Sequence, residues 1–247
     1  MRFIFIRHAE PDYEHNTITE KGHREAAILA QRIKNWQVDR FYCSPLGRAQ
    51  DTARPSLELL GRKAVTLDWL QEFRGTAYNE ITGSADGCWD MYPECWTAQP
   101  ALYGKDHWDD APLLAGTNCR AEYDDVIRNL DGLLASCGYH REQNCYRVER
   151  HSDETLVCFC HLGITCIMLS HLLGISPIVL LHSLFIPASS VTIVQSEERN
   201  PAIASFRCQS IGDTSHLYAA GEPVSWMASF AHPFQERPYS NLETPRF

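Results

Sequence analysis

The chain has 247 residues, of which 44% are hydrophobic and 21% charged, and this composition excludes wholesale disorder. The formal net charge of −9 argues against a nucleic-acid backbone or an anionic membrane as the main partner, because both are negatively charged. A small anion in a locally basic pocket is still compatible with it. The length allows one large α/β domain, and no linker is long enough to separate two, so residues 1–247 are expected to form a single domain.

In chain order, the pattern of apolar residues predicts ten elements. They are a strand at 2–7, a helix at 20–36 after a Thr19 cap, a strand at 39–43, a helix at 46–61, a strand at 64–67, a helix at 119–137, a strand at 155–160, a helix at 163–173, and strands at 190–195 and 203–209. Strands that alternate with helices indicate a mainly parallel sheet covered on both faces.

Residues 155–196 contain no Asp, Glu, Lys or Arg, which is a pattern that also occurs in membrane spans. His161, Gly163, Gly174, Pro177 and Pro187 interrupt this stretch at spacings that make strand, turn, helix, loop and strand. A buried core is therefore favoured over a membrane segment.

The chain has ten cysteines, several of them inside apolar runs. Cys158 and Cys160 are too closely spaced for a zinc ribbon, and Cys88 and Cys95 have no second pair at metal distance. The chain also starts without a cleavable signal. Reduced, mostly buried thiols in a cytoplasmic protein without a metal are the expectation.

Polar side chains follow the predicted strands at the edge where ligands bind in such sheets. Arg7 and His8 end the first strand, Arg48 lies in the first turn of the helix after 39–43, His161 follows 155–160, and Glu72 follows 64–67. Taken singly, Arg48 could pair with surface carboxylates, His161 could be a satisfied core histidine, and Glu72 could be solvated. Their coincidence at strand ends favours one pocket.

Two arginines and two histidines near helix N-termini suit a doubly charged anion, and phosphate is the obvious one. A histidine beside that anion is a nucleophile if one ring nitrogen is free while the other donates to a carbonyl. The sequence has neither a GxxxxGK[ST] loop nor a carboxylate pair with metal spacing, so a nucleoside triphosphatase and a two-metal phosphatase are not supported.

Six motifs together carry a family resemblance: RHAE at 7–10, ITEKGHREA at 18–26, SPLGRAQDTA at 44–53, LQE at 70–72, CHLGIT at 160–165 and GDTSHL at 212–217. In order and context they resemble the histidine phosphatase superfamily, the phosphoglycerate mutase-like proteins. The resemblance implies a three-layer α/β/α sandwich, mostly parallel with one antiparallel strand, and no cofactor.

The resemblance also implies roles for the site residues. His8 is similar to the histidine that becomes phosphorylated, Arg7, Arg48 and His161 to the phosphate cradle, and Glu72 to the proton donor for the leaving oxygen. Ala9 is a common variant of the family glycine. Leu162 replaces the usual glycine after the second histidine, which leaves open how closely the substrate approaches there.

The expected function is a phosphomonoester hydrolase that acts on a small phosphorylated metabolite through a phosphohistidine. A phosphoglycerate mutase-type isomerase is the first alternative, but only ten residues, 9–18, separate His8 from Thr19, fewer than in the glycolytic mutases. A non-catalytic protein that binds phosphorylated ligands is the alternative from another class. A homodimer and the identity of the substrate are left open.

Two segments lie outside the common pattern. Residues 76–118 are rich in aromatic and acidic residues and are expected to be an inserted lid that sorts substrates, or else a small packed cluster. The C-terminal segment, 222–247, is expected to be an extended tail that packs against its own domain or a second subunit.

Overall fold

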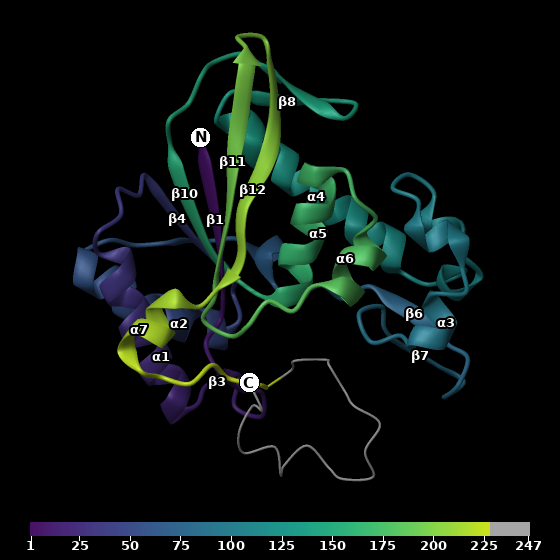
Figure 1. Cartoon of the computed structure of the whole chain (residues 1–247), viewed down its shortest axis with the longest axis horizontal. Helices are drawn as coiled ribbons and strands as arrows, with labels where there is room; N and C mark the ends of the chain where they lie inside the picture. Colours follow the sequence, from purple (N-terminus) through teal and green to yellow (C-terminus); the bar gives the residue numbers. More distant parts are fainter. Residues whose placement is uncertain (228–247) are drawn as a thin grey trace.

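The computed structural model describes residues 1–227, and its core is an eight-stranded sheet with the order β5-β4-β10-β1-β11-β12-β9-β8 (Figure 1). In chain order these strands are β1 (Arg2–Arg7), β4 (Arg40–Cys43), β5 (Val65–Thr66), β8 (Tyr139–Glu142), β9 (Cys145–Val148), β10 (Thr155–Cys160), β11 (Val191–Asn200) and β12 (Ile203–Asp213). All six predicted strands are present, with β11 and β12 longer than expected.

The directions of the strands divide the sheet into two parts. Strands β5, β4, β10 and β1 are parallel, whereas β11, β12, β9 and β8 each run antiparallel to the preceding neighbour in the sheet. Six strands therefore share the direction of β1, and β11 and β9 oppose it. The predicted mostly parallel sheet is confirmed with one addition, because the β8–β9 hairpin supplies a second opposing strand.

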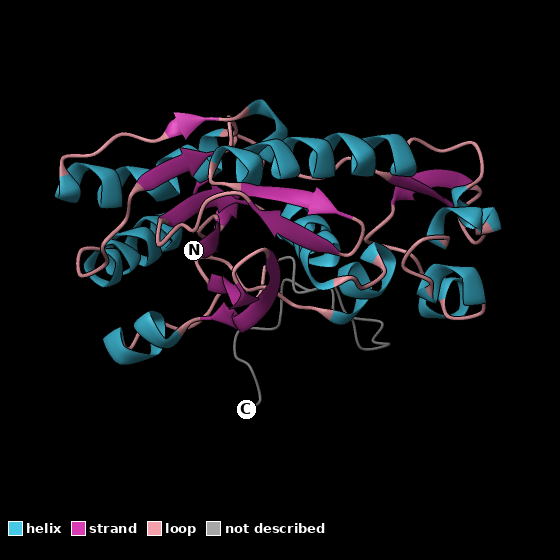
Figure 2. Ribbon diagram, turned by 90° about the horizontal axis from the view of Figure 1, so that it is seen from above, coloured by secondary structure: helices cyan, strands magenta, loops and turns pink. Residues whose placement is uncertain are grey.

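Alternating side chains show that both faces of the sheet are buried. In β1, Phe3 and Phe5 join one hydrophobic cluster, while Ile4 and Ile6 join another on the opposite face. One cluster includes residues of α4 (Cys119–Ser136), α5 (Leu162–Leu173) and α6 (Pro177–Ser183), and the other includes residues of α1 (Glu20–Ile33) and α2 (Gly47–Leu60). Figure 2 shows helices on both sides of the strands, which confirms the three-layer α/β/α architecture.

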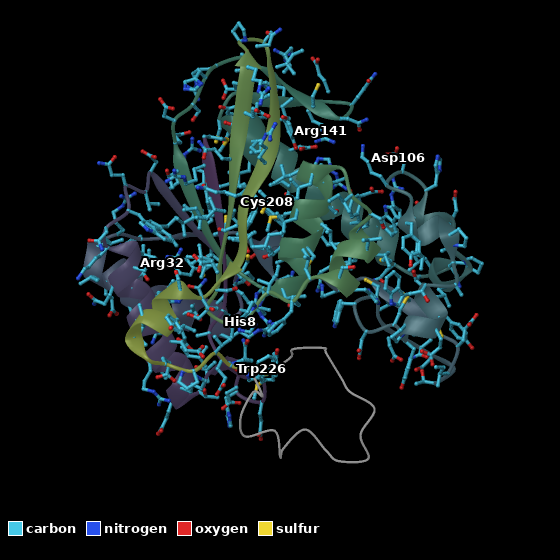
Figure 3. All side chains as sticks on the ribbon, in the orientation of Figure 1. His8, Arg32, Asp106, Arg141, Cys208 and Trp226 are labelled. Atoms are coloured by element: carbon cyan, nitrogen blue, oxygen red, sulfur yellow. The ribbon has the colours of Figure 1, made fainter. Side chains whose placement is uncertain are left out.

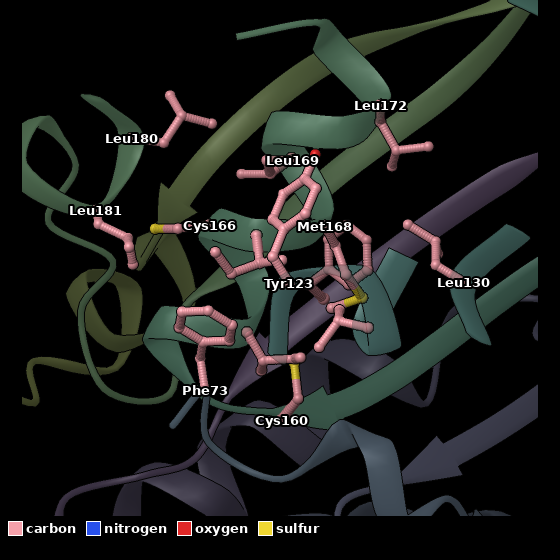
Figure 4. Packing of buried hydrophobic residues seen from close by; sticks show 14 of the residues in the cluster. Phe73, Tyr123, Leu130, Cys160, Cys166, Met168, Leu169, Leu172, Leu180 and Leu181 are labelled. Carbon is pink, nitrogen blue, oxygen red and sulfur yellow. The ribbon is translucent and has the colours of Figure 1, made fainter. Parts of the chain in front are cut away.

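The uncharged stretch 155–196 forms the centre of the larger cluster. It contains β10, α5, α6 and the start of β11, and in α5 every residue from Leu162 to Leu172 is buried. Figure 4 shows Cys166, Met168 and Leu169 of this helix packed with Phe73 and Tyr123. Burial inside the protein thus accounts for the missing charges, and no helix within residues 1–227 is long and apolar enough to cross a bilayer.

The predicted helices begin and end close to the expected residues because their capping signals are used. The Thr19 hydroxyl accepts a hydrogen bond from the backbone N–H of Gly22 at the start of α1. Helices α2 and α5 are followed by Gly61 and Gly174 with φ of 60° and 69°, the left-handed conformation that glycine adopts at low cost. Helix α1 ends at Ile33, three residues before the predicted end.

Residues 76–118 contain little regular structure. They form the hairpin β6 (Thr76–Asn79) and β7 (Ser84–Gly87), the short helix α3 (Pro93–Trp96), and the 3₁₀ turns η2 (Pro100–Tyr103), η3 (Trp108–Asp110) and η4 (Pro112–Leu114). Leu102, Trp108 and Leu113 from this segment are buried in the same cluster as the sheet. The segment is therefore attached to the main core.

The remaining elements are short. They are β2 (Pro11–Asp12), β3 (Thr17–Ile18), η1 (Asp68–Leu70) and α7 (Ser215–Ala220). Beyond α7, Glu222 pairs with Lys21 of α1 at 2.9 Å, and the Trp226 ring stacks on Phe185 with centroids 6.0 Å apart. The first part of the predicted tail thus packs against its own domain, and the rest of it, 228–247, lies outside the described residues.

Candidate active site

The parallel half of the sheet brings the predicted residues to one edge. Because Arg7 of β1 is paired with Cys160 of β10, the residues that follow, His8 and His161, are neighbours. The N–H of His8 donates to the Cys160 carbonyl at 2.9 Å, and the two imidazole rings are 5.1 Å apart between centroids. Figure 3 shows His8 at the end of the sheet where β1 terminates.

His8 is buried and has a defined tautomer. Its Nδ1 lies 2.8 Å from the Ala9 carbonyl oxygen, which can only accept, so Nδ1 carries the proton. The lone pair is then on Nε2. Burial, followed by the nearby charge of Arg7, lowers the pKa of His8 well below its ordinary value, so the ring is neutral at neutral pH.

Arg7 and Arg48 are each partly satisfied by the protein. Nη1 of Arg7 donates to the Ile186 carbonyl at 2.6 Å, and Nη1 of Arg48 donates to Oδ1 of Asn16 at 3.2 Å. The Arg48 guanidinium also lies over the ring of Tyr13, 5.5 Å from its centroid. In both arginines Nε is buried without a hydrogen-bond partner among the described residues, which leaves donors for an anion.

His161 lies between the end of β10 and the start of α5. Its Nε2 is 2.7 Å from Oγ of Ser44, whereas its Nδ1 is buried and has no partner within residues 1–227. Burial, followed by the neighbouring His8 and Arg48, lowers its pKa well below the ordinary value. His161 is therefore a neutral imidazole with one unused nitrogen.

Glu72 follows η1 and approaches the start of α5. One of its oxygens, Oε1, accepts hydrogen bonds from the N–H groups of Phe73 at 2.9 Å and Ile164 at 3.2 Å. Burial raises the pKa of this carboxyl group, although these N–H donors and Arg7 oppose the shift. The protonated acid is thereby favoured.

Gly163 and Leu162 have different surroundings. A Cβ atom at Gly163 would lie 2.8 Å from Oε1 of Glu72, closer than real contacts allow, so the glycine permits this approach. Leu162 is buried in the larger hydrophobic cluster. Its effect on substrate approach stays a prediction.

Several residues that support the site were not identified from the sequence. Thr52 accepts from the Ala9 N–H at 2.9 Å and donates to the Arg48 carbonyl at 2.7 Å, so it links the residue after His8 to the first turn of α2. Ser44 and Thr52 both lie in the SPLGRAQDTA motif, whose polar residues beside Arg48 were an available signal. Tyr13, Asn16 and Ile186 come from loops, where no periodicity indicates the direction of a side chain or carbonyl.

Comparisons with known proteins agree with the geometry. Residues 3–110 match the histidine phosphatase superfamily (branch 1). The 2,3-bisphosphoglycerate-dependent phosphoglycerate mutase of Thermoplasma acidophilum is 35% identical over 94 residues, which are 32% of this chain and 47% of the mutase. The alignments span about half the length of the curated relatives that the chain matches.

The fold extends the similarity over most of the chain. A mutant phosphoserine phosphatase from Entamoeba histolytica, solved with phosphoserine, superposes with a TM-score of 0.58 at 20% identity, covering 87% of this chain and 98% of that one. The mycobacterial glucosyl-3-phosphoglycerate phosphatase gives a TM-score of 0.55 at 18% identity, covering 86% and 99%. The molecule thus has the fold of the phosphoglycerate mutase-like proteins. Residues 3–110 are thus similar to the histidine phosphatase superfamily (branch 1), and over most of the chain the similarity is one of fold.

Proposed function

We propose that the protein is a metal-independent phosphomonoesterase that hydrolyses a small phosphorylated metabolite through a phosphohistidine at His8. The observation that carries the proposal is the tautomer of His8. Its Nδ1–H is held by the Ala9 carbonyl, so a neutral Nε2 with a lone pair stands among arginines that have unused donors.

In the proposed first step, Nε2 of His8 forms a bond to phosphorus while the bond from phosphorus to the ester oxygen breaks. Arg7, Arg48 and His161 hold the phosphoryl oxygens. Glu72, whose pKa is raised by burial, gives its proton to the departing alkoxide.

In the second step, the Glu72 carboxylate takes a proton from water as that water attacks phosphorus and the P–N bond breaks. Inorganic phosphate leaves, and both His8 and Glu72 return to their starting protonation states. The net reaction is hydrolysis of one phosphomonoester.

A phosphatase is favoured over a mutase because the segment after His8 is only the short β2–β3 turn, which offers little surface to hold a phosphoglycerate during isomerisation. Retention of all five site residues favours an enzyme over a protein that merely binds phosphorylated ligands. The similar folds include phosphatases named for phosphoserine and for glucosyl-3-phosphoglycerate. A small phosphorylated metabolite is therefore the proposed class of substrate.

The proposal also covers organisation and location. The described residues, 1–227, form one domain, and residues 76–118 are an insertion that sorts substrates by contacts outside the phosphate pocket. A cytoplasmic location is supported by ten free cysteines, of which seven are buried. A homodimer is not part of the proposal.

The test is to trap the intermediate. Protein incubated with ³²P-labelled substrate and denatured in alkali should carry an acid-labile, alkali-stable label, and His8→Ala should remove both the label and turnover. His23→Ala, at an exposed histidine of α1, is the matched control and should change neither. Full turnover by His8→Ala without a label would overturn the mechanism. A panel of sugar phosphates, nucleotides, phosphoglycerates and phosphoamino acids then identifies the substrate.

A further inference from the structure

We propose that Ser44 is a positioning residue that fixes the tautomer of His161, so that His161 presents an Nδ1–H donor to a phosphoryl oxygen. The inference rests on the proposed function only in taking a phosphoryl group as the occupant of the pocket. Ser44 is fully buried at the end of β4, and its Oγ is 2.7 Å from Nε2 of His161.

The direction of this hydrogen bond follows from the other partners of Ser44. The N–H of Leu46 donates to the Ser44 hydroxyl at 3.2 Å, so the hydroxyl already accepts one bond. Within residues 1–227 the only acceptor near its own proton is Nε2 of His161. If Nε2 were protonated instead, the Ser44 proton would be buried without an acceptor, which is unfavourable.

The charge state of His161 then fixes what the second nitrogen can do. A neutral imidazole has one N–H, and when Nε2 accepts from Ser44 that N–H is on Nδ1. Nδ1 is the buried ring nitrogen that has no partner in the described part of the chain. The rings of His8 and His161 are 5.1 Å apart between centroids, so an anion beside His8 is also close to His161. An Nδ1–H of His161 would attract this anion, whereas a bare Nδ1 lone pair would repel it.

The two histidines thus use the same tautomer for opposite purposes. In His8 the Nδ1–H donates to the Ala9 carbonyl, and the free nitrogen, Nε2, is a base. In His161 the basic nitrogen, Nε2, accepts from the Ser44 hydroxyl, and the free nitrogen, Nδ1, is a donor. The choice is made by the neighbour, a carbonyl in one case and a hydroxyl in the other.

The experiment compares Ser44→Ala with Ser56→Ala. Ser56 is a fully buried serine of α2 whose Oγ has no partner among the described residues, so its replacement controls for the loss of a buried hydroxyl. Inhibition constants for inorganic phosphate and vanadate should rise about 10- to 100-fold in Ser44→Ala, as expected for a hydrogen bond to an anion, and stay unchanged in Ser56→Ala.

A second readout is the tautomer itself. In ¹⁵N and ¹³C NMR spectra of histidine-labelled protein, His161 should be protonated on Nδ1 in the wild type and in Ser56→Ala, and should gain the Nε2–H form in Ser44→Ala. Protonation of wild-type His161 on Nε2, or unchanged phosphate inhibition in Ser44→Ala, would overturn the inference.

These outcomes are separable from failure of the proposed function. The NMR tautomer and phosphate binding need no turnover, so a protein that hydrolyses no phosphomonoester can still confirm the role of Ser44. Conversely, an active enzyme in which Ser44→Ala changes neither readout confirms hydrolysis and overturns the positioning role alone.

Discussion

Glu72 has its two carboxyl oxygens in different environments. Oε1 accepts two backbone N–H groups, whereas no side chain or backbone donor within residues 1–227 contacts Oε2. A proton on the acid is therefore placed on Oε2, because Oε1 is occupied by donors. This arrangement holds one oxygen still and leaves the other to exchange a proton with a substrate.

We expect Glu72→Gln to slow transfer from an alkyl phosphate by about 10²- to 10⁴-fold, and from p-nitrophenyl phosphate far less. The alkoxide must be protonated as it leaves, whereas p-nitrophenolate is stable without a proton. Single-turnover rates are needed, because the same carboxylate is proposed to activate the water later. Glu94→Gln, at an exposed glutamate of α3, is the control. An equal fall in the transfer rates of both substrates would show that Glu72 is a binding or structural residue and not the proton donor.

The sequence predicted which side chains lie together in the site, but not the hydrogen bonds that position them. Arg7, His8, Arg48, His161 and Glu72 were placed together because strand ends in a parallel sheet share an edge, and the structure does bring them to one edge. The Arg7–Ile186 contact joins residues 179 positions apart through a loop carbonyl. No side-chain pattern encodes such a contact.

Among the elements, the segment 76–118 has aromatic residues of two kinds. Trp108 is only 1% exposed and packs edge-on against Tyr123 of α4, with ring centroids 5.2 Å apart. Trp96 is partly buried and contacts the rings of Tyr103 at 5.6 Å and His182 of α6 at 5.0 Å. The ring contacts of both tryptophans are those of a packed cluster, and the sorting of substrates by this segment stays a prediction.

We expect Trp108→Ala to lower the free energy of unfolding by about 3–5 kcal/mol, because it empties a large volume in the core. Trp96→Ala should cost less and should change the relative kcat/KM values across the phosphomonoester panel. Urea unfolding and steady-state rates measure the two effects, and Tyr218→Ala, at an 89% exposed ring of α7, is the control. Equal stability losses with unchanged relative rates would show that the segment does not sort substrates.

The elements that the sequence missed are short or have mixed patterns. The β8–β9 hairpin carries His140, Arg141, Glu142 and Arg147, so its alternation of apolar and polar residues is weak. Helices α6 and α7 have seven and six residues, too few to show a helical period. Long elements with one or two buried faces were predicted correctly, because burial produces a regular pattern of apolar residues over many positions.

On the scale of the whole molecule, buried neutral histidines link stability to pH. The pKa values of His8 and His161 lie well below the ordinary value, and burial lowers those of His182 and His216 to about 4. Between about pH 6.5 and pH 4 the unfolded chain binds protons that the folded protein does not. Stability contributed by these groups is therefore lost as the pH falls through this window.

We expect the Tm to decrease from pH 6.5 to pH 4 and the decrease to be smaller in His182→Gln. Each unit by which the folded pKa lies below the unfolded one corresponds to about 1.4 kcal/mol at low pH. Thermal unfolding monitored by circular dichroism over this range is the measurement, with His23→Gln as the control at an exposed site. An identical pH dependence in His182→Gln would mean that folding does not lower the pKa of this histidine.

The position of β1 in the sheet has a consequence for how the protein is made. Strand β1 is synthesised long before its two neighbours in the sheet, β10 and β11, which pair with it through residues 155–160 and 191–195. A ribosome must therefore add more than 180 residues before both edges of β1 are covered. During that time its apolar faces and unpaired backbone are open to wrong partners, and closing such distant contacts is slow. Arg7 and His8 would thus be translated long before the strands that hold β1 in place beside His161.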